Sequence, residues 1–260
     1  MTTNSTAATH SLIHADCIAA MQSMPSASYD LIFADPPYFL SSGGTSCSGG
    51  KRVSVDKGDW DKTRTPEEIH DFNIRWLTES YRLLKDTGSL FVCGTYHNIF
   101  DVGVCLTEIG FHVRNMVTWQ KNNPPPNLGC RCFKHSTEFI IWAVKDTSKH
   151  YFNYELMKEL NGGKQMTDVW TGSRTPMREK RFGKHPTQKP LYILERIIQA
   201  ASQPGDWILD PFCGSGTTGV AAVINERNFV GIDKSKEYIE LSRARIDHES
   251  QLIRKEDIIH

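Results

Sequence analysis

The stretch WILDPFCGSGTTG at positions 207–219 decides the fold of this 260-residue chain. A short apolar run typical of a buried strand enters a glycine-rich turn, and the residues after the turn have a helical pattern. Gly214, Gly216 and Gly219 have the G-x-G-x-x-G spacing of a nucleotide-binding turn, and Asp233 follows 19 residues after Gly214. The stretch therefore predicts a strand–turn–helix unit that binds an adenosine-type cofactor, although a tight turn without a ligand has the same spacing.

The rest of the chain repeats this alternation of short apolar segments with turns and helical patterns. Such an order is typical of an α/β fold with a mainly parallel sheet. Strands are predicted at 11–14, 30–34, 89–93, 113–120, 138–144, 207–210 and 229–232. A helix that begins at Thr65, with a capping box to Glu68, is expected to end at Gly88. Further helices are predicted at 191–201, from Thr217 and from Ser235.

The composition narrows the class of protein. Thirty Lys and Arg balance thirty Asp and Glu, and no apolar run is long enough for a membrane span. The polar N-terminus lacks the pattern of a signal peptide, and the seven cysteines have no framework spacing, so a reduced, cytoplasmic protein is expected. Cys130, Cys132 and His135 could form part of a zinc site, but the sequence has no matching second pair of ligands, and no metal site is predicted.

Basic residues are concentrated in one part of the chain. Positions 120–189 contain thirteen Lys and Arg against six Asp and Glu, a net charge of +7, and the densest run lies at 174–189. Such a run is either a solvated loop or a surface that faces a polyanion such as a nucleic acid.

Two long stretches carry no pattern of a helix or strand. Positions 41–60 are rich in glycine and serine and predict a mobile loop beside the acidic turn at 35–38. Positions 122–133 contain three consecutive prolines, which a helix interior or a central strand does not accept. Loops of this length in a compact domain are usually functional or disordered.

The stretch LIFADPPYFL at 31–40 predicts a second strand that ends in an acidic turn. An exocyclic amine of a nucleic-acid base is a poor nucleophile because its lone pair is delocalised into the ring. The carboxylate of Asp35 and the carbonyl of Pro36, which the stiff pair of Pro36 and Pro37 holds still, can accept its two N–H groups and free the lone pair for attack. Tyr38 offers a ring on which an extruded base can stack.

The acid before the glycines indicates which cofactor is bound. Asp210 at the end of its strand would repel a pyrophosphate, but it suits the cationic ammonium and sulfonium groups of S-adenosylmethionine. The motif DPFCGSGTT, about 175 residues after the DPPY turn, resembles the β group of amino-group DNA methyltransferases. The blocks ADPPYFLSSGG, VSVDKGDWDK, TWQKNNPPPN, MKELNGGKQMTDVWTGS and GKHPTQKP extend this resemblance over nearly the whole chain, to DpnA-like adenine-N6 methyltransferases of DpnII-type restriction systems.

The resemblance implies one methyltransferase domain over 1–260, a circularly permuted Rossmann-like fold. Its sheet would have seven mainly parallel strands, one of them antiparallel, with helices on both faces. The catalytic residues would be Asp35, Pro36, Pro37 and Tyr38. S-adenosylmethionine would be bound by Asp16, Cys17, His185, Thr187, Lys189, Asp210, Phe212, Gly214, Ser215, Gly216, Thr217 and Asp233. Target recognition would fall roughly at 145–183, and DNA contacts are expected from Trp119, Lys121, Asn122, Arg174, Arg178, Lys180 and Arg181.

The resulting hypothesis is a site-specific DNA methyltransferase that transfers a methyl group from S-adenosylmethionine to the N6 amine of a flipped-out adenine. The resemblance implies the sequence GATC, a restriction-modification system with a cognate endonuclease, and double-stranded or single-stranded DNA as substrate. The sequence predicts no oligomeric state, and a dimer stays open. N4-cytosine methylation is the main alternative, although an SPPY turn is commoner there and Asp35 favours adenine. Methylation of RNA or of protein amides, an NAD-dependent oxidoreductase and a catalytically silent DNA-binding module also stay open.

Overall fold

The computed structural model of the chain describes residues 8–39, 45–48, 51–54, 64–127 and 129–259. Within them, eight strands form one sheet in the order β1-β10-β9-β2-β5-β7-β6-β8. Their bounds are β1 (His10–His14), β2 (Tyr29–Ala34), β5 (Leu84–Gly94), β6 (His112–Lys121), β7 (Thr137–Val144), β8 (Val169–Gly172), β9 (Trp207–Asp210) and β10 (Asn228–Asp233). Every strand predicted from the sequence is confirmed, and the predicted number of seven was too low by one.

The sheet is parallel except at one strand. β7 runs antiparallel to both of its neighbours, β5 and β6, while the other pairs are parallel. Because β7 is reversed, its first residues lie at the edge where the parallel strands end, and Gly94 at the end of β5 pairs with Phe139. A residue at the start of β7 can therefore reach the same edge as residues that follow the parallel strands.

The additional strand is β8, which pairs with β6 at one end of the sheet, with Thr118 opposite Val169. It lies inside the segment 145–183 that the sequence assigned to target recognition. Its four residues include one buried side chain, that of Trp170, so the apolar signal was too short to predict a strand. Part of this segment thus extends the main sheet.

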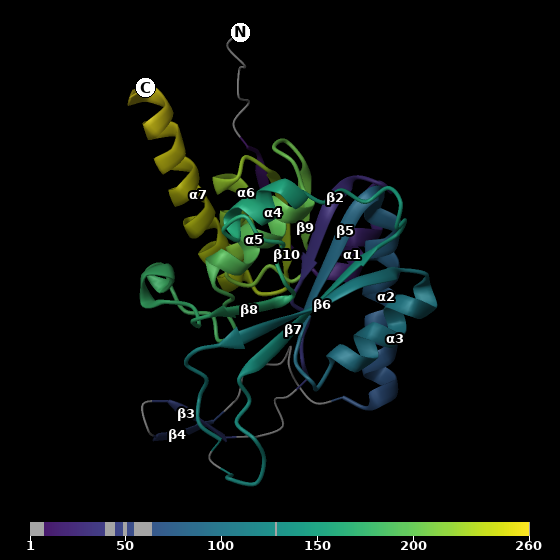
Figure 1. Ribbon diagram of the computed structural model, residues 1–260, viewed down its shortest axis with the longest axis vertical. Coiled ribbons are helices and arrows are strands. Elements are labelled where there is room, and N and C mark those ends of the chain that lie inside the picture. Colours follow the sequence, from purple (N-terminus) through teal and green to yellow (C-terminus); the bar gives the residue numbers. More distant parts are fainter. Residues whose placement is uncertain (1–7, 40–44, 49–50, 55–63, 128, 260) are drawn as a thin grey trace.

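Helices cover both faces of the sheet (Figure 1). One face carries α1 (Cys17–Gln22), α2 (Pro66–Leu83) and α3 (Ile99–Ile109), whose buried residues share one core cluster. The other face carries α5 (Leu191–Ala201), α6 (Thr217–Ile224) and α7 (Lys236–Ile259), whose buried residues share a second cluster. A short helix, α4 (Tyr154–Leu160), packs against α5. The helices predicted at 191–201, from Thr217 and from Ser235 are confirmed.

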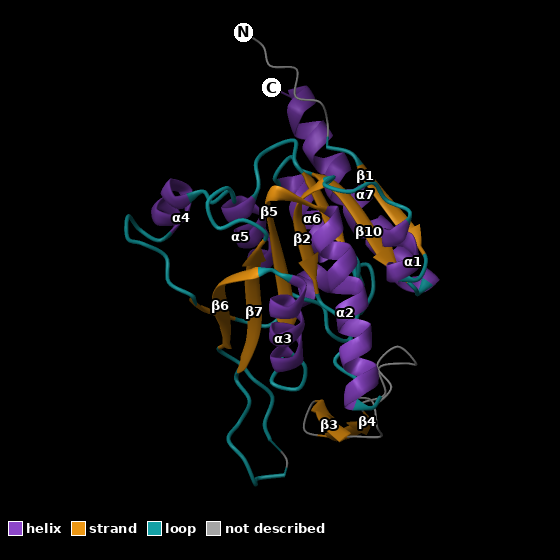
Figure 2. Cartoon of the chain, turned by 90° about the vertical axis from the view of Figure 1, so that its right-hand side faces the viewer, coloured by secondary structure: helices purple, strands orange, loops and turns teal. Residues whose placement is uncertain are grey.

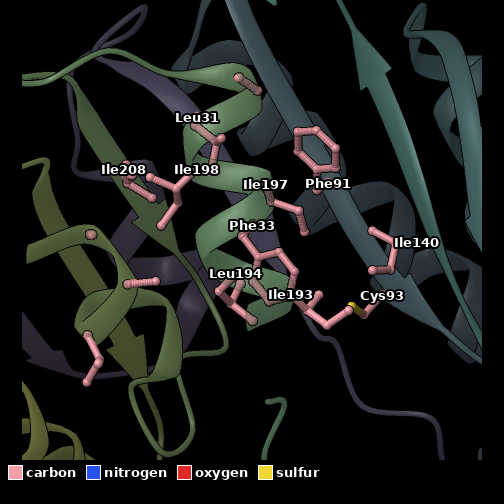
Figure 3. Packing of buried hydrophobic residues seen from close by; sticks show 14 of the residues in the cluster. Leu31, Phe33, Phe91, Cys93, Ile140, Ile193, Leu194, Ile197, Ile198 and Ile208 are labelled. Atoms are coloured by element: carbon pink, nitrogen blue, oxygen red, sulfur yellow. The ribbon is translucent and has the colours of Figure 1, made fainter. Parts of the chain in front are cut away.

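Alternation along β2 separates the two core clusters. Leu31 and Phe33 belong to the cluster under α5, whereas Ile32 belongs to the opposite one, as expected for successive side chains of a strand. Figure 3 shows Ile193 and Ile197 of α5 pointing toward β2 and β5. Burial of each such side chain contributes about 1.5–3 kcal/mol, so the strand that leads into the DPPY turn is firmly anchored on both faces.

The boundaries of α2 were predicted correctly at one end only. Thr65 forms the predicted capping box with Glu68. The helix ends at Leu83, however, and not at Gly88, because Leu84 is already extended and begins β5. A Cβ at Gly88 would lie 2.8 Å from the carbonyl oxygen of Asp30, so this glycine allows a close approach of β5 to the start of β2.

The predicted mobile loop at 41–60 lies partly outside the described residues. Within it, β3 (Thr45–Ser48) and β4 (Lys51–Ser54) pair antiparallel and form a separate two-stranded sheet. Figure 2 shows this sheet apart from the main one. The prediction that 41–60 contains no regular element was therefore wrong, since its glycines concealed two short strands. Among the described helices, none is long and apolar enough to cross a membrane.

Candidate active site

Two acidic turns far apart in sequence meet at one edge of the sheet. β2 and β9 are parallel neighbours, with Ile32 opposite Leu209, and the chain leaves them in opposite directions, toward β5 and toward β10. Such a switch point in an open α/β sheet opens a crevice at the carboxyl ends of the strands. Asp35 follows β2 and Asp210 ends β9, so both face this crevice.

A cavity of about 420 Å³ fills the crevice. It is lined by all four predicted catalytic residues and by every predicted cofactor residue except Gly216. The cofactor residues concerned are Asp16, Cys17, His185, Thr187, Lys189, Asp210, Phe212, Gly214, Ser215, Thr217 and Asp233. The structure thus brings together segments that follow β1, β2, β9 and β10, together with the loop before α5.

The glycine turn has a backbone that requires glycine at two positions. Gly214 and Gly216 have φ angles of 48° and 74°, in the left-handed region. A Cβ at Gly216 would lie 2.8 Å from the side chain of Ser242 on α7. Gly216 therefore lies behind the turn, packed on α7, and supports the cavity without lining it.

The carboxylates around this turn are held by neutral donors. Asp233 accepts the N–H of Gly214 at 2.9 Å and that of Ser235 at 2.8 Å. Asp210 accepts the N–H of Phe212 at 3.0 Å and the hydroxyl of Thr218 at 2.5 Å. Burial raises the pKa of Asp210 to about 7, and burial also raises the pKa of Asp233. A cationic ligand would favour the ionised form of both acids.

Three of the predicted cofactor residues, Asp16, Cys17 and His185, come from segments other than the glycine turn. Asp16 caps α1 by accepting the N–H groups of Ile18 and Ala19, and it is exposed. Cys17 beside it is buried, and burial raises the pKa of its thiol to about 12, so it lines the cavity as a neutral group. His185 packs edge-on against Tyr238 at 4.3 Å between ring centroids.

Two residues of α7 support the glycine turn, and the sequence analysis missed both. Ser242 donates its hydroxyl to the carbonyl of Gly214 at 2.8 Å. Arg245 is 5 % exposed and donates to the carbonyl of Ser215 at 2.5 Å and to the hydroxyl of Thr217 at 3.0 Å. The available signal was the position of these polar residues on the otherwise apolar face of this helix.

An aromatic group beside the cavity was also missed. Phe72 on α2 lies 5.6 Å from Phe39 and 6.1 Å from Phe212 between ring centroids, and the guanidinium of Arg64 lies over the rings of Phe39 and Phe72. Trp76, one turn further along α2, packs edge-on against Phe212. The rings of Phe72 and Trp76 connect Phe39, which follows the DPPY turn, with Phe212, two residues before Gly214. The two turns therefore share one apolar wall.

The DPPY turn holds its acid through side chains. Tyr38 donates its hydroxyl to Asp35 Oδ1 at 2.6 Å, and Lys189 Nζ donates to Oδ2 at 2.6 Å. Lys189 is buried beside Asp35 and is therefore not a surface charge. Burial opposes the charge of Lys189, but neighbouring carboxylates outweigh it and raise its pKa well above the usual range.

Glu138 extends this arrangement, and no sequence pattern marked it. It lies near the start of the reversed strand β7, with one carboxylate oxygen 2.5 Å from Lys121 Nζ and the other 3.5 Å from Lys189 Nζ. Lys121 is therefore paired with a protein acid, although it was predicted to contact DNA. Trp119 was predicted at the same edge but is 4 % exposed and belongs to the core, because its side chain points to the buried face of β6.

The other predicted DNA contacts lie on the surface, outside the cavity lining. Asn122, Arg174, Arg178 and Arg181 are exposed, and Lys180 is half-buried. Arg181 pairs with Glu249 at 3.0 Å. A polyanion-facing surface along this segment stays a prediction.

Comparison with known proteins places these features in a family. The DNA methylase family matches residues 29–244, a range that includes both acidic turns and the segment between them. The chain belongs to this family. It is 56% identical over 242 residues to the type II methyltransferase M2.DpnII of Streptococcus pneumoniae, with 92% of this chain and 90% of the relative covered. It is 48% identical over 242 residues to the type II methyltransferase M2.MboI of Moraxella bovis, with 93% and 89% covered.

Solved structures support the same assignment. The complex of M1.HpyAVI with SAM matches with a TM-score of 0.67 and 30% identity, over 92% of this chain and 99% of that chain. The cytosine-N4-specific PvuII DNA methyltransferase matches with a TM-score of 0.73 over 95% and 93% of the two chains, but at 20% identity it shows a likeness of fold alone. The chain is a DNA methyltransferase, and the family decides against the NAD-dependent oxidoreductase that the glycine spacing left open.

Proposed function

We propose that this DNA methyltransferase transfers a methyl group from S-adenosylmethionine to the N6 amine of an adenine extruded from DNA. The observation that carries the proposal is the shared cavity, which places the DPPY acid beside the glycine turn through the pairing of β2 with β9. The cavity residues fit the cofactor, because Asp210 is buried, Asp233 is half-buried, and both acids are held by neutral donors. A cationic ligand compensates the desolvation that raises their pKa values.

The DPPY turn positions the amine. Asp35 accepts one N–H and the carbonyl of Pro36 accepts the other, which directs the nitrogen lone pair along the line of attack. Bound S-adenosylmethionine supplies a methyl group on a sulfonium, which needs no further activation. The new N–C bond forms as the C–S bond breaks and its electron pair stays on sulfur. The surplus proton on the methylated nitrogen passes to the Asp35 carboxylate and from there to water.

The same turn supports adenine over cytosine. An aspartate at the first position of the tetrad is typical of adenine-N6 methyltransferases, whereas serine is commoner in the N4-cytosine group. The relatives M2.DpnII and M2.MboI are type II methyltransferases, and the similarity to them supports a role beside a restriction endonuclease. The recognition sequence GATC is proposed from the resemblance of the sequence motifs to those of DpnII-type enzymes. The proposal includes recognition of DNA by the segment 145–183, through exposed basic side chains such as those of Arg174 and Arg178.

Transfer of tritium from labelled S-adenosylmethionine to plasmid DNA tests the proposal, with nucleosides separated after digestion. We expect the label in N6-methyladenine, and sequencing of modified plasmid should place it in GATC. Label in N4-methylcytosine would contradict the choice of base, and label at another sequence would contradict the choice of site. Label in neither nucleoside, with DNA and cofactor both bound, would contradict the reaction itself.

A further inference from the structure

Lys189 stands between two carboxylates at unequal distances. Its Nζ lies 2.6 Å from Asp35 Oδ2 and 3.5 Å from Glu138 Oε2. The side chains are largely buried, with 8 % of Lys189, 15 % of Asp35 and 16 % of Glu138 exposed. Lys189 also donates to the hydroxyl of Tyr38 at 3.3 Å. In such surroundings the ammonium cannot exchange a carboxylate for water without a penalty, so its anionic partner is one of these two acids.

Glu138 has one oxygen engaged and one available. Lys121 donates to Oε1 and so fixes the carboxylate from the far side. Oε2 is buried and accepts no hydrogen bond from the described part of the chain. Its nearest donor is Lys189 Nζ at 3.5 Å, too far for a strong hydrogen bond. A buried acceptor that is held so loosely is unfavourable and calls for an explanation.

Each oxygen of Asp35, in contrast, already accepts one hydrogen bond. Tyr38 occupies Oδ1 and Lys189 occupies Oδ2. The proposed reaction requires Asp35 to accept an N–H of the target amine as well, and the ammonium of Lys189 competes with that N–H for the same carboxylate. A carboxylate whose charge is compensated by a close ammonium is a weaker acceptor, so the amine is held more strongly when Lys189 moves away.

We propose that Glu138 is a positioning residue that receives Lys189 from Asp35 when the target amine binds. Nζ then closes from 3.5 Å to about 2.8 Å from Glu138 Oε2, which satisfies that oxygen and frees Asp35 Oδ2 for the amine. Lys189 stays protonated throughout, and the total charge of the buried group is unchanged. The inference rests on the proposed role of Asp35 as the acceptor of the amine.

The charge state of Glu138 agrees with this role. Burial would raise its pKa, but Lys189 and Lys121 outweigh burial and lower it, so the acid is ionised and able to hold the ammonium. Its place on the reversed strand β7 puts it at the catalytic edge without making it part of the cavity wall. A residue there acts on Asp35 through Lys189 and has no contact with the base.

Glu138→Gln removes the charge and keeps the shape, and it tests the proposal in the full chain. We expect kcat for methyl transfer to fall about tenfold or more, because Lys189 has no second anion to move to. The KM for DNA and the affinity for S-adenosylmethionine should stay within about twofold of the wild type. Glu79→Gln is the matched control, since Glu79 is also 16 % exposed and pairs with Arg82 at 2.8 Å on α2; all parameters should stay unchanged.

A wild-type kcat in Glu138→Gln would overturn the inference. So would a joint loss of kcat, cofactor affinity and thermal stability, which is the signature of a merely structural role. Should Glu138→Gln fail to fold, Glu138→Asp keeps the charge but withdraws it by one methylene. The same selective loss of kcat is then expected, and a wild-type kcat in a folded Glu138→Asp would be equally decisive against it.

The Asp35→Ala variant separates this inference from the proposed function. An active Asp35→Ala variant, or a wild-type chain that methylates no DNA, contradicts the proposed function itself. A wild-type chain that is active, an inactive Asp35→Ala variant and a fully active Glu138→Gln variant together contradict only the role of Glu138.

Discussion

The two acidic turns on the cavity hold their carboxylates by different means. At the glycine turn, Asp210 and Asp233 accept hydrogen bonds from backbone amides and one threonine hydroxyl. At the DPPY turn, Asp35 accepts hydrogen bonds from two side chains, those of Tyr38 and Lys189. Backbone donors cannot leave unless the turn unfolds, whereas side chains can change partners. The glycine turn is therefore a preformed binding site. The DPPY turn holds an acceptor whose hydrogen-bond donors can change during a reaction.

The largest expected effect is a loss in the rate of methyl transfer when the acid of the DPPY turn is removed. Asp35→Ala removes the proposed acceptor of the amine, and we expect the single-turnover rate of methyl transfer to fall about 10³-fold. Thermal stability should fall, because Lys189 loses the closer of its two carboxylate partners, so the rate is measured at a temperature where the variant is folded. A variant that kept a tenth of the wild-type rate would contradict the role given to this acid.

A smaller effect is expected from Gly216→Ala at the preformed turn. The new Cβ would occupy a left-handed position and meet Ser242 at 2.8 Å, and we expect a loss of about 3 kcal/mol in the free energy of unfolding. Gly162→Ala is the control, since Gly162 has a φ of 65° and open space around it. It should lose about 1 kcal/mol from the backbone alone. Equal losses would show that the contact with α7 contributes nothing, and chemical denaturation measures both.

Asp210→Asn tests whether the buried charge of Asp210 contributes more to the binding of S-adenosylmethionine than to the stability of the fold. The folded-state pKa of about 7 is above the value of 3.8 for a free carboxyl. The folded chain therefore binds more protons between these values, and its stability falls as the pH rises from about 4 to about 7. Asparagine has no such charge, so the variant should equal or exceed the wild type in thermal stability at pH 8. It should nevertheless bind S-adenosylmethionine about tenfold more weakly.

Calorimetry at pH 8 and pH 5.5 checks this pair of outcomes. For the wild type, cofactor affinity should rise with pH through about 7, as the carboxylate becomes ionised. Unchanged cofactor affinity in Asp210→Asn would mean that the acid serves only to hold Thr218 and Phe212 in place.

The smallest expected effect lies outside both turns. Arg178→Ala should weaken DNA binding by about 0.5–1 kcal/mol and lower the slope of log K against log salt by about 1, since an exposed arginine contacts a single phosphate. Arg75→Ala on α2, which is 58 % exposed and outside the basic segment, is the control and should change neither quantity. Identical salt slopes in wild type and Arg178→Ala would remove this residue from the DNA-binding surface.

The sequence was most informative where local chemistry fixes structure. Apolar runs and turn residues predicted the strands that lead to both acidic turns, and the capping box at Thr65 predicted the start of α2. It was least informative where tertiary pairing decides. Glu138 became an active-site neighbour because β7 is reversed, and Trp119 was drawn into the core by the face of β6 on which it lies. Neither outcome follows from residues close by in the chain.

Cofactor affinity of Asp35→Ala, measured by titration calorimetry with S-adenosylmethionine, tests the division between the two turns most directly. We expect the variant to bind the cofactor as the wild type does, because Asp210, Asp233 and their backbone donors are untouched, and to transfer the methyl group about 10³-fold more slowly. Loss of cofactor binding together with activity would contradict the division, since the two turns would then form a single inseparable site.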